Sequence, residues 1–321
     1  MSKERFLVTG AFGCIGAWVV RELVNEGTET AVFDLDTNPH RLKLLLADDQ
    51  LANLNFIQGD VTDLTAVSHA IQEAKATHII HLAALQVPAC RANPPLGAAI
   101  NVTGTVNIFE AAKQADLKHV VYASSIAVFG PKEAYPPEPL ANDALHLPRT
   151  HYGVYKSANE GTARLYHAEH GINSVTLRPY TVYGPARDQG MTSTPTKAML
   201  AAARGEPYHI SFGGRCVYNF AQDTARAFIQ AARMPYEGAG AFNLPGPVAH
   251  MSEIIAAIEM CEPSMKGKLS YESLDLPFPE AVDPAPFESA FPNSDILPLA
   301  EGVERTIAMF KDVLANGRLT I

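Results

Sequence analysis

The sequence predicts an α/β fold in which a doubly wound parallel sheet is followed by a smaller C-terminal lobe. In the first half of the chain, short and almost wholly apolar runs alternate with segments whose apolar residues recur at helical spacing. Strands that are apolar along their whole length are expected where helices cover both faces of a parallel sheet. A glycine-rich turn follows the first apolar run, and the alternation loosens after Gly130. Repeated alternation of strands and helices favours a doubly wound sheet.

The expected elements can be placed in order along the chain. Strands are expected at residues 5–9, 30–34, 55–59, 78–83, 118–123 and 174–179, with a short strand at 241–244. Helices are expected at residues 16–26, 65–74, 96–114, 152–170, 196–204, 223–233 and 301–314. Prolines interrupt the pattern at 131–148 and again at 277–292, so these two stretches are expected to be loops.

The composition favours a globular protein and argues against a nucleic-acid binder. Of the 321 residues, 47% are apolar and 18% are charged, which is enough apolar material for a full core. The net charge is −9 and no run of basic residues stands against it, so no nucleic acid is expected as a partner.

No apolar run approaches the roughly 20 residues that span a bilayer, and no signal peptide precedes the first strand, so we expect a cytoplasmic protein without membrane contact. The four cysteines lie far apart, and we expect free thiols and no metal site.

The turn after the first strand carries Gly10, Gly13 and Gly16 in the order GxxGxxG. Glycines there let the chain turn tightly and let its backbone approach a pyrophosphate at the positive end of the next helix. The second strand ends at Asp34, where an acid accepts hydrogen bonds from adenosine ribose hydroxyls and repels a 2′-phosphate. Together these features predict a Rossmann-type dinucleotide site that prefers NAD over NADP, a preference that Arg41 could counter. The alternative is that Asp34 only caps the following turn.

A second constellation combines a serine, a tyrosine and a lysine. Tyr152 and Lys156 stand four residues apart in an expected helix and therefore share one face. An ammonium near a phenol stabilises the phenolate, so we expect Lys156 to lower the pKa of Tyr152 from about 10 and make it a general acid and base. Ser125 follows an apolar strand, at the edge where ligands bind in such sheets, and is expected to hold a substrate oxygen against Tyr152. The alternative is a surface helix and a serine that bonds only to nearby backbone.

These motifs and several others resemble the extended short-chain dehydrogenase/reductases, in their NAD-dependent epimerase/dehydratase branch. The matching segments, spread over residues 6–185, are TGAFGCIG at 9–16, GDV at 59–61, HLAA at 81–84, NVTGT at 101–105, SS at 124–125, YGVYK at 152–156 and LRPYTVYGP at 177–185. The resemblance implies that NAD is the cofactor and that it is bound by the glycine turn with Cys14 and Ile15, and by Asp34, Asp60, Val61, Ala83, Asn101, Tyr152, Lys156, Pro179 and Tyr180. It also implies hydride transfer between a substrate carbon and the nicotinamide, with Tyr152 moving the hydroxyl proton.

The chain is expected to divide into two parts. An NAD-binding domain spans residues 1–172, with strand 173–180 and part of 215–245 returning to it, and a substrate-binding lobe lies mainly in 181–321. The resemblance further implies a homodimer, in which the helix that carries Tyr152 and the preceding helix form a four-helix interface.

Several positions depart from the family pattern and bear on the substrate. Ser125 is followed by Ile126 and not by the acid usual in dehydratases and decarboxylases of sugar nucleotides, which disfavours those activities. Cys216 stands where sugar-nucleotide enzymes tend to place a diphosphate-binding arginine, with Arg215 one position early. Thr181 stands where the epimerases often have asparagine. The candidates for binding substrate are Gln86, Arg91, Ser125, Thr181, Arg187 and Arg215, with the three arginines as candidates for holding an anion.

Three functions remain open at this point. The resemblance favours an NAD-dependent epimerase or oxidoreductase of a sugar or sugar nucleotide, which transfers a hydride at a secondary alcohol with a Ser–Tyr–Lys site. The departures favour an NAD-dependent dehydrogenase of a small non-nucleotide carbohydrate, such as a polyhydroxy acid, a uronate or a free sugar. The third function is a non-catalytic dinucleotide-sensing regulator, although such proteins usually lose the tyrosine or the lysine, and both Tyr152 and Lys156 are present.

Overall fold

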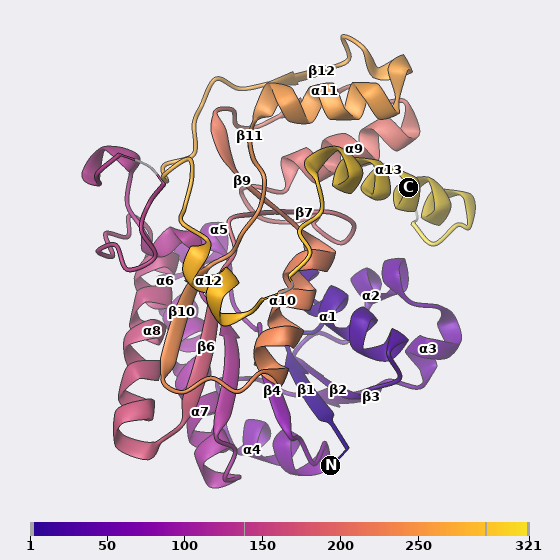
Figure 1. The fold of residues 1–321 in the computed structure, drawn as a ribbon. Helices are drawn as coiled ribbons and strands as arrows, with labels where there is room; N and C mark the ends of the chain where they lie inside the picture. The colour runs from indigo at the N-terminus through magenta and orange to yellow at the C-terminus, as the bar shows by residue number, and fades with distance from the viewer. Residues whose placement is uncertain (1–2, 138, 293, 320–321) are drawn as a thin grey trace.

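The computed structural model describes residues 3–137, 139–292 and 294–319, and its centre is a seven-stranded parallel sheet (Figure 1). The strands run in the order β10-β6-β5-β4-β1-β2-β3, and their bounds are β1 (Arg5–Thr9), β2 (Glu29–Asp34), β3 (Asn55–Gln58), β4 (His78–His81), β5 (His119–Ala123), β6 (Asn173–Arg178) and β10 (Ala239–Asn243). The direction of winding reverses between β1 and β4, so the sheet is doubly wound with its switch point there. Each of these strands corresponds to one expected from the sequence, and the α/β fold class is confirmed.

Helices cover both faces of this sheet, which explains why the central residues of most of its strands are buried and largely apolar. The first face carries α1 (Cys14–Asn25) and α10 (Ala221–Arg233), and the second carries α4 (Leu64–Glu73), α7 (Gly104–Gln114) and α8 (His151–His170). Neighbouring residues of β1 alternate between the two cores, since Val8 packs with Phe228 on the first face and Leu7 packs with Phe109 on the second.

The C-terminal part of the chain adds a three-stranded sheet, ordered β11-β9-β7, and a two-stranded sheet, β12-β8. The elements here are β7 (Thr181–Tyr183), α9 (Thr194–Arg204), β8 (Tyr208–Ile210), β9 (Arg215–Phe220), β11 (Val248–His250), α11 (Met251–Cys261), β12 (Leu269–Tyr271) and α13 (Leu299–Ala315). They enclose a core of their own that includes Met199, Phe212 and Ile307. The two proline-rich stretches meet beside this core, because Leu140 forms a parallel β-bridge with Val282.

The expected helix 96–114 is interrupted in the structure. It consists of α6 (Pro94–Ala98), a π-helical turn at Ala99–Thr103, and α7. Asn101 is fully buried in that turn, where its Nδ2 donates to the Gly97 carbonyl at 2.9 Å. Asn159 of α8 donates in turn to the Asn101 carbonyl at 2.9 Å. These contacts connect the widened turn to α8. The sequence predicts one continuous helix here because the spacing of apolar residues does not distinguish such a turn from an α-helix.

The structure also contains short helices that the sequence pattern does not predict. They are α2 (His40–Leu45), α3 (Asp48–Ala52), α5 (Val87–Ala92) and α12 (Ala285–Ala290), with 3₁₀ turns at Ile126–Val128, Lys132–Ala134 and Pro263–Met265. None of these segments exceeds 6 residues, which is too short for a hydrophobic period to be read. Among the described helices, none combines the length and the apolar character that crossing a bilayer requires.

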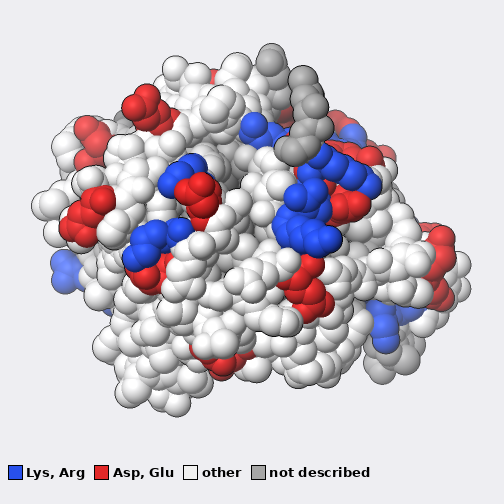
Figure 2. All heavy atoms as spheres, turned by 90° about the horizontal axis from the view of Figure 1, so that it is seen from below, with Lys and Arg blue, Asp and Glu red and all other residues white. Residues whose placement is uncertain are grey.

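The face at the amino ends of the strands carries acidic and basic side chains that are interspersed (Figure 2). Exposed ion pairs account for part of this mixture, including Lys3 with Glu29 and Arg233 with both Glu4 and Glu26. Exposed pairs of this kind contribute little to stability. The opposite edge, at the carboxyl ends of the strands, is the one where ligands bind in doubly wound sheets.

A buried ion pair joins α8 to β6 beneath that carboxyl edge. Glu160 and Arg178 expose 1% and 4% of their side-chain surface, and Arg178 donates to both carboxylate oxygens, at 2.9 and 2.7 Å. Ser124 donates to Glu160 at 2.5 Å, and Arg178 also donates to the Asn142 carbonyl at 2.7 Å. Burial alone would raise the pKa of Glu160, but the hydrogen bonds and charge of Arg178 hold that pKa below its ordinary value. The pair is therefore ionised at neutral pH.

We predict that Arg178→Met lowers the free energy of unfolding by about 3–5 kcal/mol, because it leaves the Glu160 carboxylate buried without its partner. Urea unfolding at neutral pH, followed by circular dichroism, measures the change. The control is Arg305→Met, which removes an exposed i,i+4 partner of Glu301 and is expected to cost less than about 1 kcal/mol. Equal losses in the two variants would contradict the importance of the buried pair.

Candidate active site

The turn between β1 and α1 brings its backbone against the end of β4. Gly10 has a φ of 65°, and a Cβ there would lie 2.4 Å from the backbone nitrogen of Ala83. A Cβ at Gly16 would lie 2.3 Å from the Gly10 carbonyl oxygen. Because the obstructing atoms are backbone, only glycine fits at both positions. The turn therefore presents bare backbone at the start of α1, an arrangement suited to a pyrophosphate.

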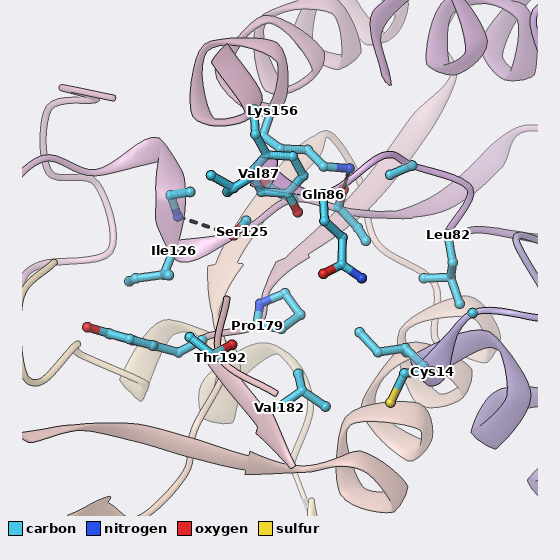
Figure 3. Close-up of a pocket in the computed structure, with 18 of the residues that line it drawn as sticks. Cys14, Leu82, Gln86, Val87, Ser125, Ile126, Lys156, Pro179, Val182 and Thr192 are labelled. Carbon is cyan, nitrogen blue, oxygen red and sulfur yellow. Dashed lines mark hydrogen bonds between the residues drawn. The ribbon is translucent and has the colours of Figure 1, made fainter. Parts of the chain in front are cut away.

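Two adjoining cavities run along this edge of the sheet. One cavity, of about 230 Å³, lies at the ends of β2 and β3, and the other, of about 200 Å³, lies at the ends of β5 and β6 and is shown in Figure 3. Gly10, Gly13, Leu82 and Ala84 line both cavities, so the two form one groove across the switch point. We call them the β2 cavity and the β5 cavity. A groove with bare backbone at its middle fits an elongated dinucleotide.

Asp34 stands at the end of β2 with its carboxylate turned towards the glycine turn. Its oxygens accept hydrogen bonds from the backbone N–H of Phe12, at 2.9 Å, and of Asp36, at 3.1 Å. Burial raises the pKa of Asp34, and these two bonds oppose the rise. Arg41 lines the same cavity but donates to Asp188 at 2.8 Å and to the Phe12 carbonyl at 2.8 Å. The guanidinium of Arg41 is therefore already engaged by other groups.

Ser125, Tyr152 and Lys156 line the β5 cavity together. Figure 3 labels Ser125 and Lys156 at this cavity. Ser125 follows β5, and the other two lie in the first two turns of α8, which begins with Thr150 accepting a backbone N–H at 3.0 Å. Lys156 Nζ donates to the Ala123 carbonyl at 2.7 Å and lies 5.6 Å from the centroid of the Tyr152 ring. The strand end and the helix face thus meet at one cavity.

The pKa of Tyr152 is shifted in the opposite direction from the one that the sequence predicts. Burial raises the pKa of Tyr152, and a hydrogen bond with Ser125 and the charge of Arg187 offset only part of the rise. The prediction that Lys156 lowers this pKa below its ordinary value is wrong, because the phenol is buried and Nζ is turned to the Ala123 carbonyl. Burial also lowers the pKa of Lys156 to about 8. At neutral pH the phenol keeps its proton and the lysine keeps its charge.

Most of the predicted site residues line one of the two cavities. The β5 cavity is lined by Gly10, Gly13, Cys14, Ile15, Gly16, Gln86, Ser125, Tyr152, Lys156, Pro179, Tyr180 and Arg187. The β2 cavity is lined by Gly10, Gly13, Asp34, Asp60, Val61 and Ala83. Asn101 lines neither cavity and is connected to the site through its contact with α8.

Three predicted substrate residues do not line the cavities. Arg91 is exposed on α5. Thr181 is fully buried, and its hydroxyl is 3.4 Å from the sulfur of Cys216 in a hydrogen bond. Arg215 lies at the exposed start of β9, where it pairs with Glu253 at 3.1 Å. The neighbouring position, where related enzymes tend to have the arginine, is also outside the cavity: Cys216 is buried and is not among the residues that line it.

The β5 cavity also contains residues that sequence reasoning missed. They are Val87, Ile126, Ala127, Val182, Met191, Thr192 and Phe278. No local signal marks them, because they come from separate loops and strand ends that only tertiary packing brings together. Phe278 lies within the second proline-rich stretch, which the sequence indicates only as a loop.

The fold and this groove define a class of enzyme that binds a dinucleotide across the switch point of a doubly wound sheet. The model of the NAD dependent epimerase/dehydratase family matches residues 6–244, and the chain belongs to this family. It is an NAD-dependent enzyme of the extended short-chain dehydrogenase/reductase type. The resemblance found in the sequence and NAD as the cofactor are confirmed.

Comparison with known proteins gives relatives of more than one activity. The chain is 31% identical over 246 residues to the UDP-glucose 4-epimerase of Mycolicibacterium smegmatis, a match that covers 75% of this chain and 76% of the relative. It superposes with a TM-score of 0.86 on an L-threonine dehydrogenase from Clostridium difficile, at 21% identity and covering 97% and 99% of the two chains. It also superposes with a TM-score of 0.78 on MoeE5 in complex with UDP-glucuronic acid and NAD, at 27% identity and covering 96% and 99%.

We predict that the wild-type protein gains stability relative to Lys156→Met as the pH rises from about 8 towards 10.5. The folded pKa lies below the unfolded value, so folding in this window requires loss of a proton that the unfolded chain keeps, and that cost falls as the pH rises. The relative gain is about 3 kcal/mol. Denaturant titrations of both proteins across this pH range measure it, and a difference that stays constant would contradict the burial of the ammonium.

Proposed function

We propose that this protein transfers a hydride at a secondary alcohol of a small polyhydroxy substrate, with Ser125, Tyr152 and Lys156 as its catalytic residues. The observation that carries the proposal is that these side chains line one cavity, which continues through the glycine turn into a second cavity with Asp34 in its lining. A hydroxyl, a phenol and an ammonium in one cavity form a set suited to proton transfer at a substrate oxygen.

We assign the cofactor to the whole groove. Asp34, Asp60 and Val61 would hold the adenosine half, where the Asp34 carboxylate favours NAD over NADP by accepting from the ribose hydroxyls. The backbone of residues 10–16 would hold the pyrophosphate. The nicotinamide half would lie among Ala83, Tyr152, Lys156, Pro179 and Tyr180, with Asn101 supporting α8 from behind.

The chemistry divides between the cofactor and the chain. NAD, when bound, supplies the acceptor for a hydride from the carbinol carbon of the substrate. Ser125 holds the substrate oxygen, and Tyr152 takes the hydroxyl proton as the C–O bond becomes a carbonyl. The charge of Arg187 favours the phenolate form of Tyr152, and the ammonium of Lys156 holds its place through the Ala123 carbonyl. In the reverse direction the Tyr152 phenol returns the proton.

An epimerase of sugar nucleotides is the second candidate, supported by the similarity to UDP-glucose 4-epimerase. In that reaction the hydride returns to the other face of the ketone, and no reduced cofactor accumulates. The exposed pair of Arg215 with Glu253 and the buried Cys216 leave the diphosphate without the expected arginine clamp, which favours a small non-nucleotide substrate. Steady accumulation of NADH would identify net dehydrogenation.

We also propose an oligomeric state and a cellular compartment for the protein. We propose a homodimer formed through α7 and α8, supported by Val154 and Leu165, apolar side chains of α8 that are 50% and 59% exposed. The described cysteines are free thiols, which supports a reducing compartment such as the cytoplasm.

We predict that Tyr152→Phe lowers kcat by about 10²–10⁴-fold, because it removes the group that moves the proton. The measurement is NADH formation with excess NAD and a panel of free sugars, aldonates, uronates and UDP-sugars. Tyr155→Phe is the control, since this phenol lies on the same helix but donates to the Pro94 carbonyl at 2.9 Å, outside the cavity. Full turnover by Tyr152→Phe would remove the tyrosine from catalysis. A wild-type protein that binds NAD and turns over no compound would favour the dinucleotide-sensing regulator.

A further inference from the structure

Arg187 brings a positive charge to the β5 cavity that no carboxylate in the described chain neutralises. Its Nη2 donates to the hydroxyl of Thr192 at 3.1 Å, while its Nε is buried and has no hydrogen-bond partner. Arg41 and Arg178, which are also partly or fully buried, each pair with a carboxylate. Arg204 shares the unpartnered Nε but does not line this cavity. A half-buried guanidinium with an unused donor indicates that a ligand anion completes its surroundings.

The backbone that carries Arg187 is held in an uncommon conformation. Ala186 has a φ of 74°, although it carries a side chain, and Gly184 has a φ of 127°. The turn is closed by the Arg187 N–H, which donates to the Gly184 carbonyl at 3.1 Å, and it is fixed by Trp18 Nε1, which donates to the Pro185 carbonyl at 2.8 Å. Backbone strain of this kind persists where the surroundings enforce it, and it clusters at ligand sites.

Gln86 lies beside this guanidinium. Both groups approach the same point, because a Cβ at Gly190 would lie 1.9 Å from Gln86 Oε1 and 3.2 Å from Arg187 Nη2. Figure 3 shows the Gln86 carboxamide projecting into the β5 cavity between Lys156 on one side and Cys14 on the other. The Gln86 atom at this shared point is the carboxamide oxygen, which accepts hydrogen bonds. The Nε2 group of the same carboxamide and the guanidinium of Arg187 both belong to the lining of the β5 cavity, and both provide N–H groups of the kind that a carboxylate accepts.

The lining of the β5 cavity has cationic side chains but no acidic one. Lys156 and Arg187 line it, and neither an aspartate nor a glutamate is among its described lining residues. Lys156 Nζ already donates to the Ala123 carbonyl. Arg187 is therefore the cationic side chain of this lining that is better placed to bind a ligand anion. A substrate with a carboxylate is favoured in such a cavity, whereas an ammonium would find no carboxylate to pair with.

We propose that the substrate is a small hydroxy carboxylic acid without an ammonium group, bound through its carboxylate by Arg187 and Gln86 while its hydroxyl lies at Ser125 and Tyr152. This inference rests on the proposed function and names the substrate class for that site. The cofactor diphosphate is the other anion that could reach Arg187. The guanidinium bonds to Thr192, and its charge also acts on the Cys14 thiol at the start of α1. Titrating NAD and the acids separately distinguishes the two anions.

Binding is measured by isothermal titration calorimetry with NAD-saturated Tyr152→Phe protein, so that turnover does not obscure the heats. The probes are D-gluconate against D-glucitol, and D-glycerate against both glycerol and L-serine. The acids are expected to bind more tightly than the neutral polyols and than serine. Adding Arg187→Met is expected to weaken binding of the acids by about 30-fold or more, because it truncates one partner of a charged hydrogen-bonded pair. The affinity for glucitol is expected to change little.

Arg91→Met in the same background is the matched control, since Arg91 is exposed and does not line the cavity, and it is expected to leave the acid affinities unchanged. The affinity for NAD is titrated separately in every variant. Acids that bind no better than their neutral counterparts would overturn the inference. So would an Arg187→Met protein that loses NAD affinity as strongly as acid affinity, since the guanidinium would then serve the cofactor. Because these are binding measurements, they are independent of whether Tyr152 proves catalytic.

Discussion

The buried pair of Glu160 and Arg178 is the interaction on which the site depends most. Glu160 follows Lys156 by one turn of α8, and its carboxylate accepts from Ser124, the neighbour of Ser125. Arg178 closes β6 directly before Pro179, which lines the β5 cavity. One ion pair therefore fixes the helix that carries the tyrosine and lysine, the strand end that carries the serine, and the loop opposite them. Replacing either partner alone leaves a buried charge, so the arrangement is held as a unit.

The second constraint is the close approach of the glycine turn to β4. Backbone atoms of Ala83 occupy the space that a Cβ at Gly10 would need, which keeps the turn itself free of a side chain at that position. The site thereby separates two environments. Asp34 places negative charge in the β2 cavity, whereas Lys156 and Arg187 place positive charge in the β5 cavity. A dinucleotide that spans both cavities would have its nicotinamide half in the cationic β5 cavity, where the substrate would meet it.

The sequence predicts the parts of this architecture that local patterns encode. The strands of the main sheet, the glycine turn and the Tyr152–Lys156 pair on one helix face follow from residue periodicity and short spacings. The π-helical turn around Asn101 does not, because it depends on contacts with Gly97 and with α8. The raised pKa of Tyr152 is likewise a property of the assembled cavity. The substrate side was predictable only in part, since nothing in the spacing separates Arg187, which faces the cavity, from Arg91 and Arg215, which do not.

In the proposed reaction, the carbinol hydrogen of a small hydroxy acid leaves as a hydride from this cavity. The most direct measurement uses D-gluconate and D-glycerate that carry deuterium on their carbinol carbons, incubated with the wild-type protein and NAD. Mass spectrometry then determines the isotope content of the recovered cofactor. We expect deuterium in the reduced nicotinamide with at least one of the acids and none with the matching neutral polyols. Cofactor recovered without deuterium from every acid, or labelled equally by the polyols, would contradict it.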